Sequence, residues 1–170
     1  AIKIRKITTS PASHIHVFGH PRGGSTILAE VIAKSINAPI VWEPFFRRKI
    51  PFKKYNYTEL WGWKEYIEPD AVNSTIDGYF QALLDEEFLN PRLFTGQSIS
   101  KIAHSKHLVF KYCYAHNMLH YLTNKFNIHP VILNRHPAQI IASRKNHGGF
   151  IKKNVSIVHT NSAQTKNSKA

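Results

Sequence analysis

The residues best suited to bind an anion lie in the stretch Gly19–Thr26, which reads GHPRGGST. Two adjacent glycines let the backbone approach a ligand closely, while an arginine and two hydroxyls supply charge and hydrogen-bond donors. The stretch follows the short β-branched run His14–Phe18 and precedes apolar residues at helical spacing. A helix that begins after a glycine turn directs its free N–H groups and positive dipole end at that turn. The spacing therefore predicts a phosphate or sulfate site.

The same stretch matches the nucleotide-binding pattern G-x-x-x-x-G-K-[ST] at every position except one. Ser25 stands where the lysine is required, and the nearest cation is Arg22, three residues earlier. The phosphate cradle is thus predicted without the lysine that contacts the β- and γ-phosphates of ATP. A tight strand-to-helix turn that binds nothing is the simpler alternative. We disfavour it because glycines, an arginine and two hydroxyls occur together in one turn.

The charge of the chain is strongly positive and unevenly distributed. The formal net charge is +13, all ten acidic residues lie between Glu30 and Glu87, and the segment from Phe88 to Ala170 carries twelve Lys or Arg. Such a field suits an anionic substrate or cofactor, or a nucleic-acid surface. Any catalytic carboxylate must lie between Glu30 and Glu87.

Length and cysteine content limit the class of protein. The 170 residues predict one domain over residues 1–153, followed by a polar basic tail at 154–170 that we expect to be poorly ordered. The sequence contains no apolar run long enough to span a membrane. Cys113 is the only cysteine, which fits a reducing compartment, so we expect a cytoplasmic protein. Cys113 itself is most simply a buried small apolar residue.

Strands and helices that position these groups are predicted to alternate along the chain. Basic and aromatic residues 45–57 are predicted to form a loop, and residues 94–106 a polar connection. Strands are expected at 14–18, 38–42, 107–112 and 129–134, and helices at 25–36, 71–89, 115–126 and 137–145.

This alternation predicts an α/β fold with a parallel sheet, helices on both faces and the three-layer architecture of P-loop NTPases. Ligands of such sheets bind at the carboxyl ends of the strands. Gly19–Thr26, Glu43, Lys111 and Arg135 all fall at strand ends on this reading. The meeting of four strand ends at one edge is the main physical argument for a site.

Enzymes that use ATP or GTP also need a magnesium ligand, commonly an Asp that ends a neighbouring strand. Here the third strand ends near Lys111 and the fourth at Asn134 and Arg135, so neither offers a carboxylate. Cations in place of a metal suit a phosphate-bearing donor that is used without magnesium.

Three motifs in register resemble the sulfotransferases that use 3′-phosphoadenosine-5′-phosphosulfate (PAPS). PRGGST at Pro21–Thr26 resembles their first motif, a strand followed by an arginine-containing turn and a helix. Arg135-His136-Pro137, with Ser143 eight residues after the arginine, resembles their second motif, whose usual Asp is replaced here by His136. The Glu-Pro of WEPF at residues 42–45 resembles the Golgi carbohydrate branch. The resemblance covers roughly residues 15–144.

The resemblance implies a transferase of EC class 2.8.2 that moves a sulfuryl group from PAPS to an acceptor hydroxyl, with carbohydrate favoured, and releases adenosine 3′,5′-bisphosphate (PAP). Family members are usually longer, so a C-terminal truncation is expected, and a trimmed eukaryotic fragment would belong in the Golgi lumen. The implied ligands of the 5′-phosphosulfate are Arg22, Gly23, Gly24, Ser25 and Thr26, and those of the 3′-phosphate are Arg135 and Ser143.

Two further roles concern catalysis. Lys111 is a looser match to a family lysine and is expected to stabilise the leaving oxygen together with Arg22. Glu43 is the hypothesised general base because it is the carboxylate predicted at a strand end beside the turn. The rival bases are the histidines at positions 20, 116 and 136.

Two other functions stay open. A P-loop kinase or nucleotide-binding protein is disfavoured by Ser25 and by the missing Asp. A basic nucleic-acid-binding module would use lysines, arginines and exposed aromatic residues. No metal site is predicted, because the pairs His14/His16 and His116/His120 lack a carboxylate or cysteine to complete them.

Overall fold

The computed structural model describes residues 14–46, 66–85 and 91–147. Most of the loop predicted at 45–57 and the whole tail predicted at 154–170 lie outside the described residues. Among the described helices, none is long and apolar enough to cross a membrane.

Four strands form the centre of the fold: β1 (Ile15–Gly19), β2 (Ile40–Trp42), β3 (Val109–Tyr112) and β4 (Pro130–Leu133). Every pairing is parallel and the order is β2-β3-β1-β4. Five helices accompany them in the described ranges: α1 (Ser25–Ser35), α2 (Ser74–Leu84), α3 (Ile99–His104), α4 (Leu119–Lys125) and α5 (Pro137–Lys145). The predicted parallel α/β sheet is thereby confirmed.

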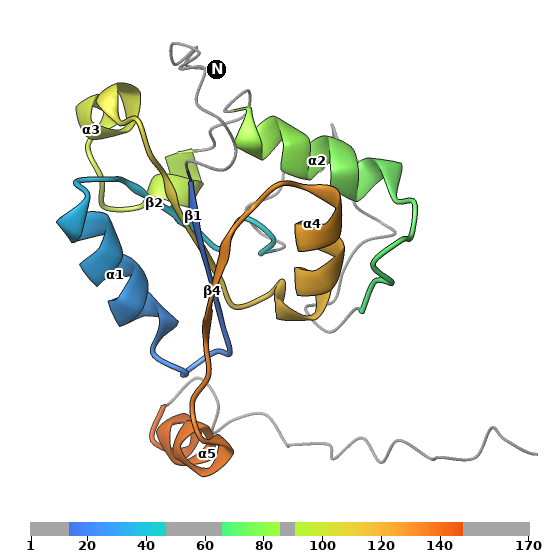
Figure 1. The fold of residues 1–170 in the computed structure, drawn as a ribbon. Helices are drawn as coiled ribbons and strands as arrows, with labels where there is room; N and C mark the ends of the chain where they lie inside the picture. Colours follow the sequence, from blue (N-terminus) through green and yellow to red (C-terminus); the bar gives the residue numbers. More distant parts are fainter. Residues whose placement is uncertain (1–13, 47–65, 86–90, 148–170) are drawn as a thin grey trace, which may run out of the picture.

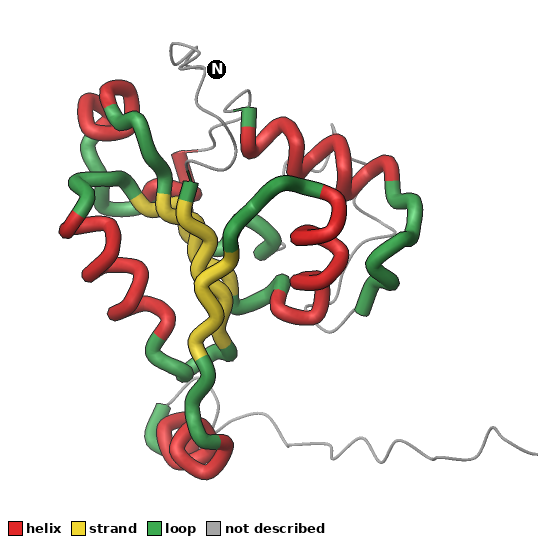
Figure 2. The backbone as a smooth tube through the Cα atoms, in the orientation of Figure 1, coloured by secondary structure: helices red, strands yellow, loops and turns green. Residues whose placement is uncertain are grey.

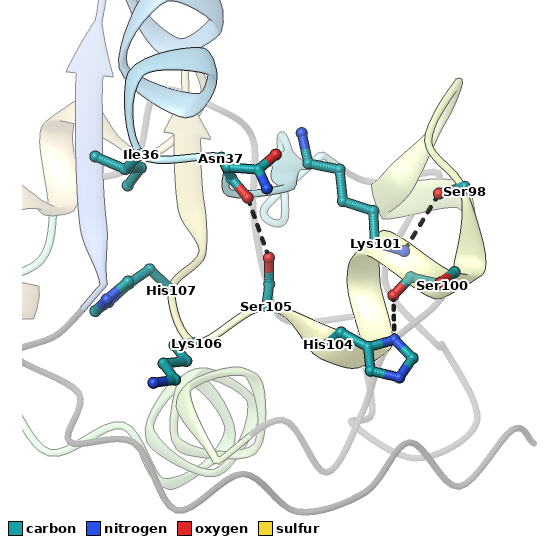
Figure 3. A pocket seen from close by; sticks show the side chains of 9 residues that line it. All are labelled: Ile36, Asn37, Ser98, Ser100, Lys101, His104, Ser105, Lys106 and His107. Atoms are coloured by element: carbon teal, nitrogen blue, oxygen red, sulfur yellow. Dashed lines mark hydrogen bonds between the residues drawn. The ribbon is translucent and has the colours of Figure 1, made fainter.

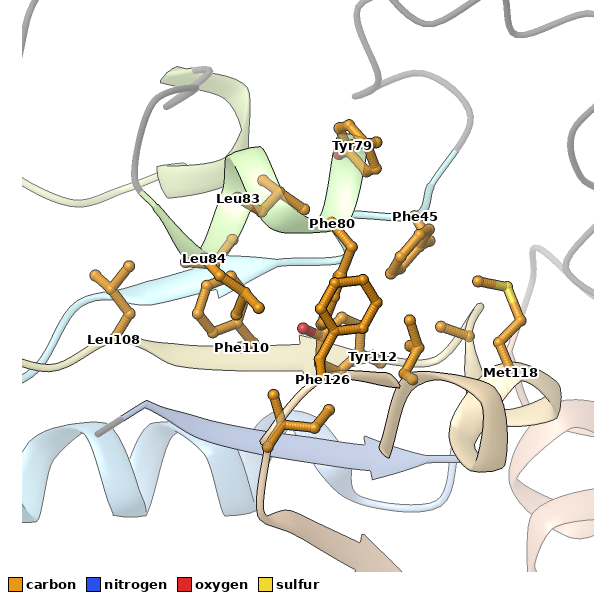
Figure 4. Packing of buried hydrophobic residues seen from close by; sticks show 14 of the residues in the cluster. Phe45, Tyr79, Phe80, Leu83, Leu84, Leu108, Phe110, Tyr112, Met118 and Phe126 are labelled. Atoms are coloured by element: carbon orange, nitrogen blue, oxygen red, sulfur yellow. The ribbon is translucent and has the colours of Figure 1, made fainter. Parts of the chain in front are cut away.

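The two faces of the sheet carry different cores. Helix α1 packs small side chains, among them Ala29 and Ala33, against Val17 and Val109 on one face. Helices α2 and α4 cover the other face with a larger cluster, much of it aromatic (Figure 1, Figure 4). The backbone tube in Figure 2 shows the twisted strands as a layer with helices on either side, as the sequence predicts. This arrangement follows from the period of two in a strand, which sends successive side chains to opposite faces.

Three sequence predictions about helices need correction. Helix α2 begins at Ser74 rather than at residue 71, because the side chain of Asn73 accepts a hydrogen bond from Ile76 N at 3.1 Å and caps the helix there. Helix α4 begins at Leu119 rather than at residue 115, after the 3₁₀ turn His116–Met118. The connection predicted as irregular at 94–106 contains α3, whose first turn is capped by Ser98.

Helix α5 begins as predicted, with Pro137 in its first turn. His136 makes the cap in place of an aspartate, since its Nδ1 accepts a hydrogen bond from Ala138 N at 3.3 Å. Figure 1 shows α5 beyond the carboxyl ends of the strands, beside the turn that joins β1 to α1, whereas α3 lies at the opposite end of the sheet. The glycine turn and the Arg135-His136-Pro137 motif, which are far apart in sequence, therefore meet at the carboxyl edge of the sheet.

Candidate functional site

The turn between β1 and α1 owes its shape to its glycines. Gly23 N donates a hydrogen bond to His20 O at 2.7 Å, and a Cβ added at Gly23 would lie 2.8 Å from the same oxygen. Gly24 has φ 98°, in the left-handed region that favours glycine, and it occupies the N-cap position of α1. No side chain from the described residues caps α1. The first-turn N–H groups are consequently available to an anion.

Arg22 joins the two halves of the predicted anion site. Its Nε donates to Ser143 Oγ at 3.2 Å, and its carbonyl oxygen accepts from an Nη of Arg135 at 3.2 Å. The contacts are possible because β1 pairs with β4, which brings the two carboxyl ends side by side. Arg22 has φ 71°, a conformation that a non-glycine residue adopts only at a cost of about 1–3 kcal/mol. Such backbone strain is characteristic of functional sites.

The two hydroxyls of the turn differ in their surroundings. Ser25 is buried, and its Oγ lies 3.3 Å from Cys113 Sγ. Thr26 is exposed. The position that holds lysine in the nucleotide-binding pattern therefore contributes a small side chain packed on the sheet, and the exposed hydroxyl belongs to the next residue.

Glu43 and Lys111 form a partly buried ion pair. Glu43 Oε1 accepts from Lys111 Nζ, and Oε2 accepts from Cys113 N at 2.7 Å. Burial opposes the charge on Lys111, but the Glu43 carboxylate and the Cys113 sulfur outweigh it and raise the pKa of Lys111. Glu43 has φ 47°, so its backbone is also strained. The pair depends on the adjacency of β2 and β3, with Glu43 N donating to Lys111 O at 2.9 Å.

The contact with Lys111 modifies the interpretation of Cys113. The thiol is buried as predicted, but its Sγ also lies 3.0 Å from Lys111 Nζ. Burial, with the Glu43 carboxylate, raises the pKa of Cys113 above its usual value. The side chain is therefore a neutral thiol that fixes the lysine and Ser25.

A pocket of about 490 Å³ brings these groups together at the carboxyl edge of the sheet. Its walls contain every predicted site residue except Gly23, which lies buried within the turn. Sequence reasoning missed Tyr114, which also lines the pocket and whose ring stacks on Phe46 with centroids 5.0 Å apart. Its place two residues beyond β3, at a strand end, was the signal that could have revealed it.

The rival histidines lie outside the pocket walls. His20 contacts Arg144, with its Nδ1 3.2 Å from an Nη, and its ring centroid lies 5.5 Å from that of His116. Burial lowers the pKa of His20. His136 Nδ1 accepts the hydrogen bond from Ala138 N that caps α5. Among the candidate bases, Glu43 is the one that lines the pocket.

A second hollow of about 600 Å³ lies at the amino end of the sheet. Figure 3 shows its basic side chains spread around a broad opening between the carboxyl end of α1 and α3. Two of its polar groups serve the local fold: Ser98 caps α3, and Ser105 Oγ donates to Asn37 O at 3.5 Å. Its basic residues are Lys101, His104, Lys106 and His107.

His14 and His16 are buried in the core near the amino end of β1. His16 lies with its ring parallel to Phe110, 4.8 Å between centroids, and its Nδ1 is 3.0 Å from the hydroxyl of Tyr112. Burial lowers the pKa of His16 to about 3 and that of His14 to about 4. In the described ranges, no three His, Cys, Asp or Glu side chains come together as a metal site.

The whole sequence matches no protein-family model, and a search of curated proteins finds no significant match. The functional argument therefore depends on the site.

Proposed function

We propose that this chain is a PAPS-dependent sulfotransferase domain that transfers a sulfuryl group to a hydroxyl acceptor, with the layer architecture of P-loop NTPases. The observation that carries the proposal is the joining of the two motifs through Arg22, which contacts both Ser143 and Arg135. A strained arginine that links a glycine turn to a second cationic turn suits a ligand with two separate anionic groups. PAPS has this form, with a 5′-phosphosulfate and a 3′-phosphate.

The residues present fit such a donor. Gly23 and Gly24 leave the part of the turn next to α1 without side chains, and the first turn of α1 offers backbone N–H donors. Arg135 and Ser143 stand on the β4 side of the pocket, where they suit the 3′-phosphate. The lining carries Arg22, Lys111 and Arg135 against the carboxylate of Glu43, so the pocket favours anions.

The reaction places two demands on the protein. When bound, the donor supplies a sulfuryl group: the acceptor oxygen forms a bond to sulfur while the sulfur–oxygen bond to phosphate breaks and its electron pair leaves with the bisphosphate. Lys111, kept cationic by Glu43, and Arg22 stabilise negative charge on the leaving side. Glu43 accepts the acceptor's proton, and its carboxylate is oriented for this by Cys113 N.

A kinase-type alternative receives less support from the donor set. The position that holds lysine in the P-loop pattern is occupied by Ser25, a neutral side chain that is buried against Cys113. The carboxylate of the pocket, Glu43, is paired with Lys111, whose positive charge beside it disfavours a divalent cation at this position.

The deciding experiment is a calorimetric titration of the 170-residue chain with PAP and with 5′-AMP, each with and without magnesium. We expect saturable binding of PAP, at least tenfold weaker binding of 5′-AMP, and no dependence on magnesium. Equal affinities for both nucleotides would refute the proposal. Affinity that requires magnesium would favour the kinase class, and binding of any polyanion with steep salt dependence would favour a nucleic-acid module.

A further inference from the structure

The pocket has two halves, which the strand order separates. The turn after β1 supplies Arg22, the turn after β4 supplies Arg135, and helix α5 supplies Ser143; together they form one half of the pocket. The ends of β2 and β3, on the other side, supply Glu43, Lys111 and Tyr114. If the proposed function holds, the donor's anions occupy the first half, and the acceptor must enter over β2 and β3.

Tyr114 is the aromatic residue of this second half, and its position is fixed relative to Glu43. Glu43 Oε2 accepts from the backbone N–H of Cys113, the residue before Tyr114. Glu43 O accepts from the backbone N–H of Phe46 at 2.9 Å. The Phe46 ring then stacks on Tyr114 at an interplanar angle of 30°. Both aromatic rings therefore belong to segments that are hydrogen-bonded to the candidate base.

The chemistry of this half indicates what the acceptor looks like. A half-buried aromatic ring offers a flat apolar face. The adjacent Glu43 carboxylate accepts from Lys111 Nζ and Cys113 N, and each of its oxygens has a further lone pair that can accept from an acceptor hydroxyl. Burial and the nearby Glu43 carboxylate raise the pKa of Tyr114, so its phenol stays a neutral hydrogen-bond donor. A pyranose ring matches both features, because it has an apolar C–H face and hydroxyls around its rim. A phenol has a single hydroxyl and a simple alcohol has no flat apolar face, so each matches only part of this half of the pocket.

We propose that Tyr114, backed by Phe46, is the platform on which the pyranose ring of a carbohydrate acceptor lies, with the reacting hydroxyl directed at Glu43. The inference rests on the proposed function and adds to it an acceptor-binding residue, Tyr114, and its support, Phe46.

The test measures binding of small ligands to the chain by saturation-transfer NMR and calorimetry, with and without saturating PAP. The probes are the methyl pyranosides of glucose, galactose and N-acetylglucosamine, the open-chain polyol sorbitol, and p-cresol as a phenol. We expect at least one pyranoside to bind more tightly than sorbitol and p-cresol. Tyr114→Ala should weaken that binding about tenfold, whereas Tyr114→Phe, which keeps the ring, should weaken it less than threefold.

Phe46→Leu provides a second variant that keeps Tyr114 and removes its support; a loss of roughly threefold to fivefold is expected. Affinity for PAP should stay unchanged in all three variants, which also shows that they are folded. Pyranoside binding that is absent, weaker than p-cresol binding or insensitive to Tyr114→Ala overturns the platform. Failure of the wild-type chain to bind PAP instead overturns the proposed function, and the measurements without nucleotide still decide whether Tyr114 binds a sugar.

Discussion

Each end of the sheet has a pocket lined by basic residues, but the two pockets differ in structure. The carboxyl-end pocket has a glycine turn, a partly buried ion pair and two strained residues, Arg22 and Glu43. The amino-end hollow is larger, and its lysines and histidines are largely exposed. Its residue with positive φ, Asn37, lies just beyond the end of α1, where such a conformation is common for asparagine.

Helix α1 explains much of the difference, because it spans both regions. Its amino end, with the positive side of the dipole, adjoins the carboxyl-end pocket, while its carboxyl end adjoins the other hollow. In a parallel sheet every returning helix is oriented in this way. The number of lysines is thus a poor guide to anion binding, and the direction of the backbone N–H groups is a better one.

The largest effect is expected for catalysis at the carboxyl end. Glu43→Gln keeps the size of the side chain and its acceptor for Cys113 N but removes the base. Turnover with PAPS and a pyranoside acceptor should fall by roughly 10²–10⁴ while PAP affinity is unchanged. Steady-state kinetics alongside calorimetry measure both quantities.

Glu30→Gln is the matched control, since Glu30 is exposed on α1 away from the pocket walls, and it should leave turnover unaltered. Near-normal turnover of Glu43→Gln would make Glu43 a structural partner of Lys111. A histidine would then be the next candidate base.

The second prediction compares a cation at each end. Arg135→Ala should weaken PAP binding by roughly 2–3 kcal/mol, or about 30- to 150-fold, and leave 5′-AMP binding nearly unchanged, because a charge-assisted contact to the 3′-phosphate is lost. Calorimetric titration with both nucleotides measures this selectivity. Ser143→Ala should show the same selectivity with a smaller loss.

Lys101→Ala and Lys106→Ala, in the amino-end hollow, should change PAP affinity by less than about twofold, because charges at the opposite end of the sheet are screened by salt. A loss of PAP affinity in these variants equal to that of Arg135→Ala would show that net charge, rather than the built pocket, governs binding.

The third prediction concerns pH and the amino end. His16, with a folded pKa of about 3, stays neutral while the unfolded residue titrates near 6.5. Its contribution to stability is therefore fully present above pH 6.5 and is lost as the pH falls toward 3. Between pH 7 and pH 5, His16 alone should lower the free energy of unfolding by about 2 kcal/mol, measured by urea denaturation.

His16→Phe keeps a ring against Phe110 and Tyr112 but has no proton to gain. The variant should therefore lose about 2 kcal/mol less than wild type over this pH range. An equal fall in both proteins would assign the acid sensitivity elsewhere, with His14 the first alternative because its pKa is lowered by burial and by His107.

Local sequence signals predicted the parts of the fold that depend on local chemistry. The glycines between His20 and Ser25 determined where α1 begins, and Pro137 did the same for α5. The caps at Asn73 and Ser98 were equally local signals, and giving them weight would have corrected α2 and revealed α3.

Other features depend on neighbours that the sequence does not reveal. Pairing of Glu43 with Lys111 requires β2 to lie beside β3, and the contact of Arg22 with Ser143 requires β1 to lie beside β4. Strand alternation predicts a parallel sheet but not this order. The positive φ angles of Arg22 and Glu43 could likewise not be predicted, because neither residue is a glycine.

The contacts of Arg22 also have a consequence for biosynthesis. Its partners Arg135 and Ser143 lie 113 and 121 residues later, and central strand β1 pairs with β3 and β4 from the second half of the chain. A ribosome makes the glycine turn early, but a nascent chain that stops before β4 has no second cationic turn to complete it. Contacts of such long range also slow folding. If the proposed function holds, competence to bind a bisphosphate nucleotide arises late in translation, after α5 has emerged, and a nucleotide added during synthesis would bind only chains that have already assembled the sheet.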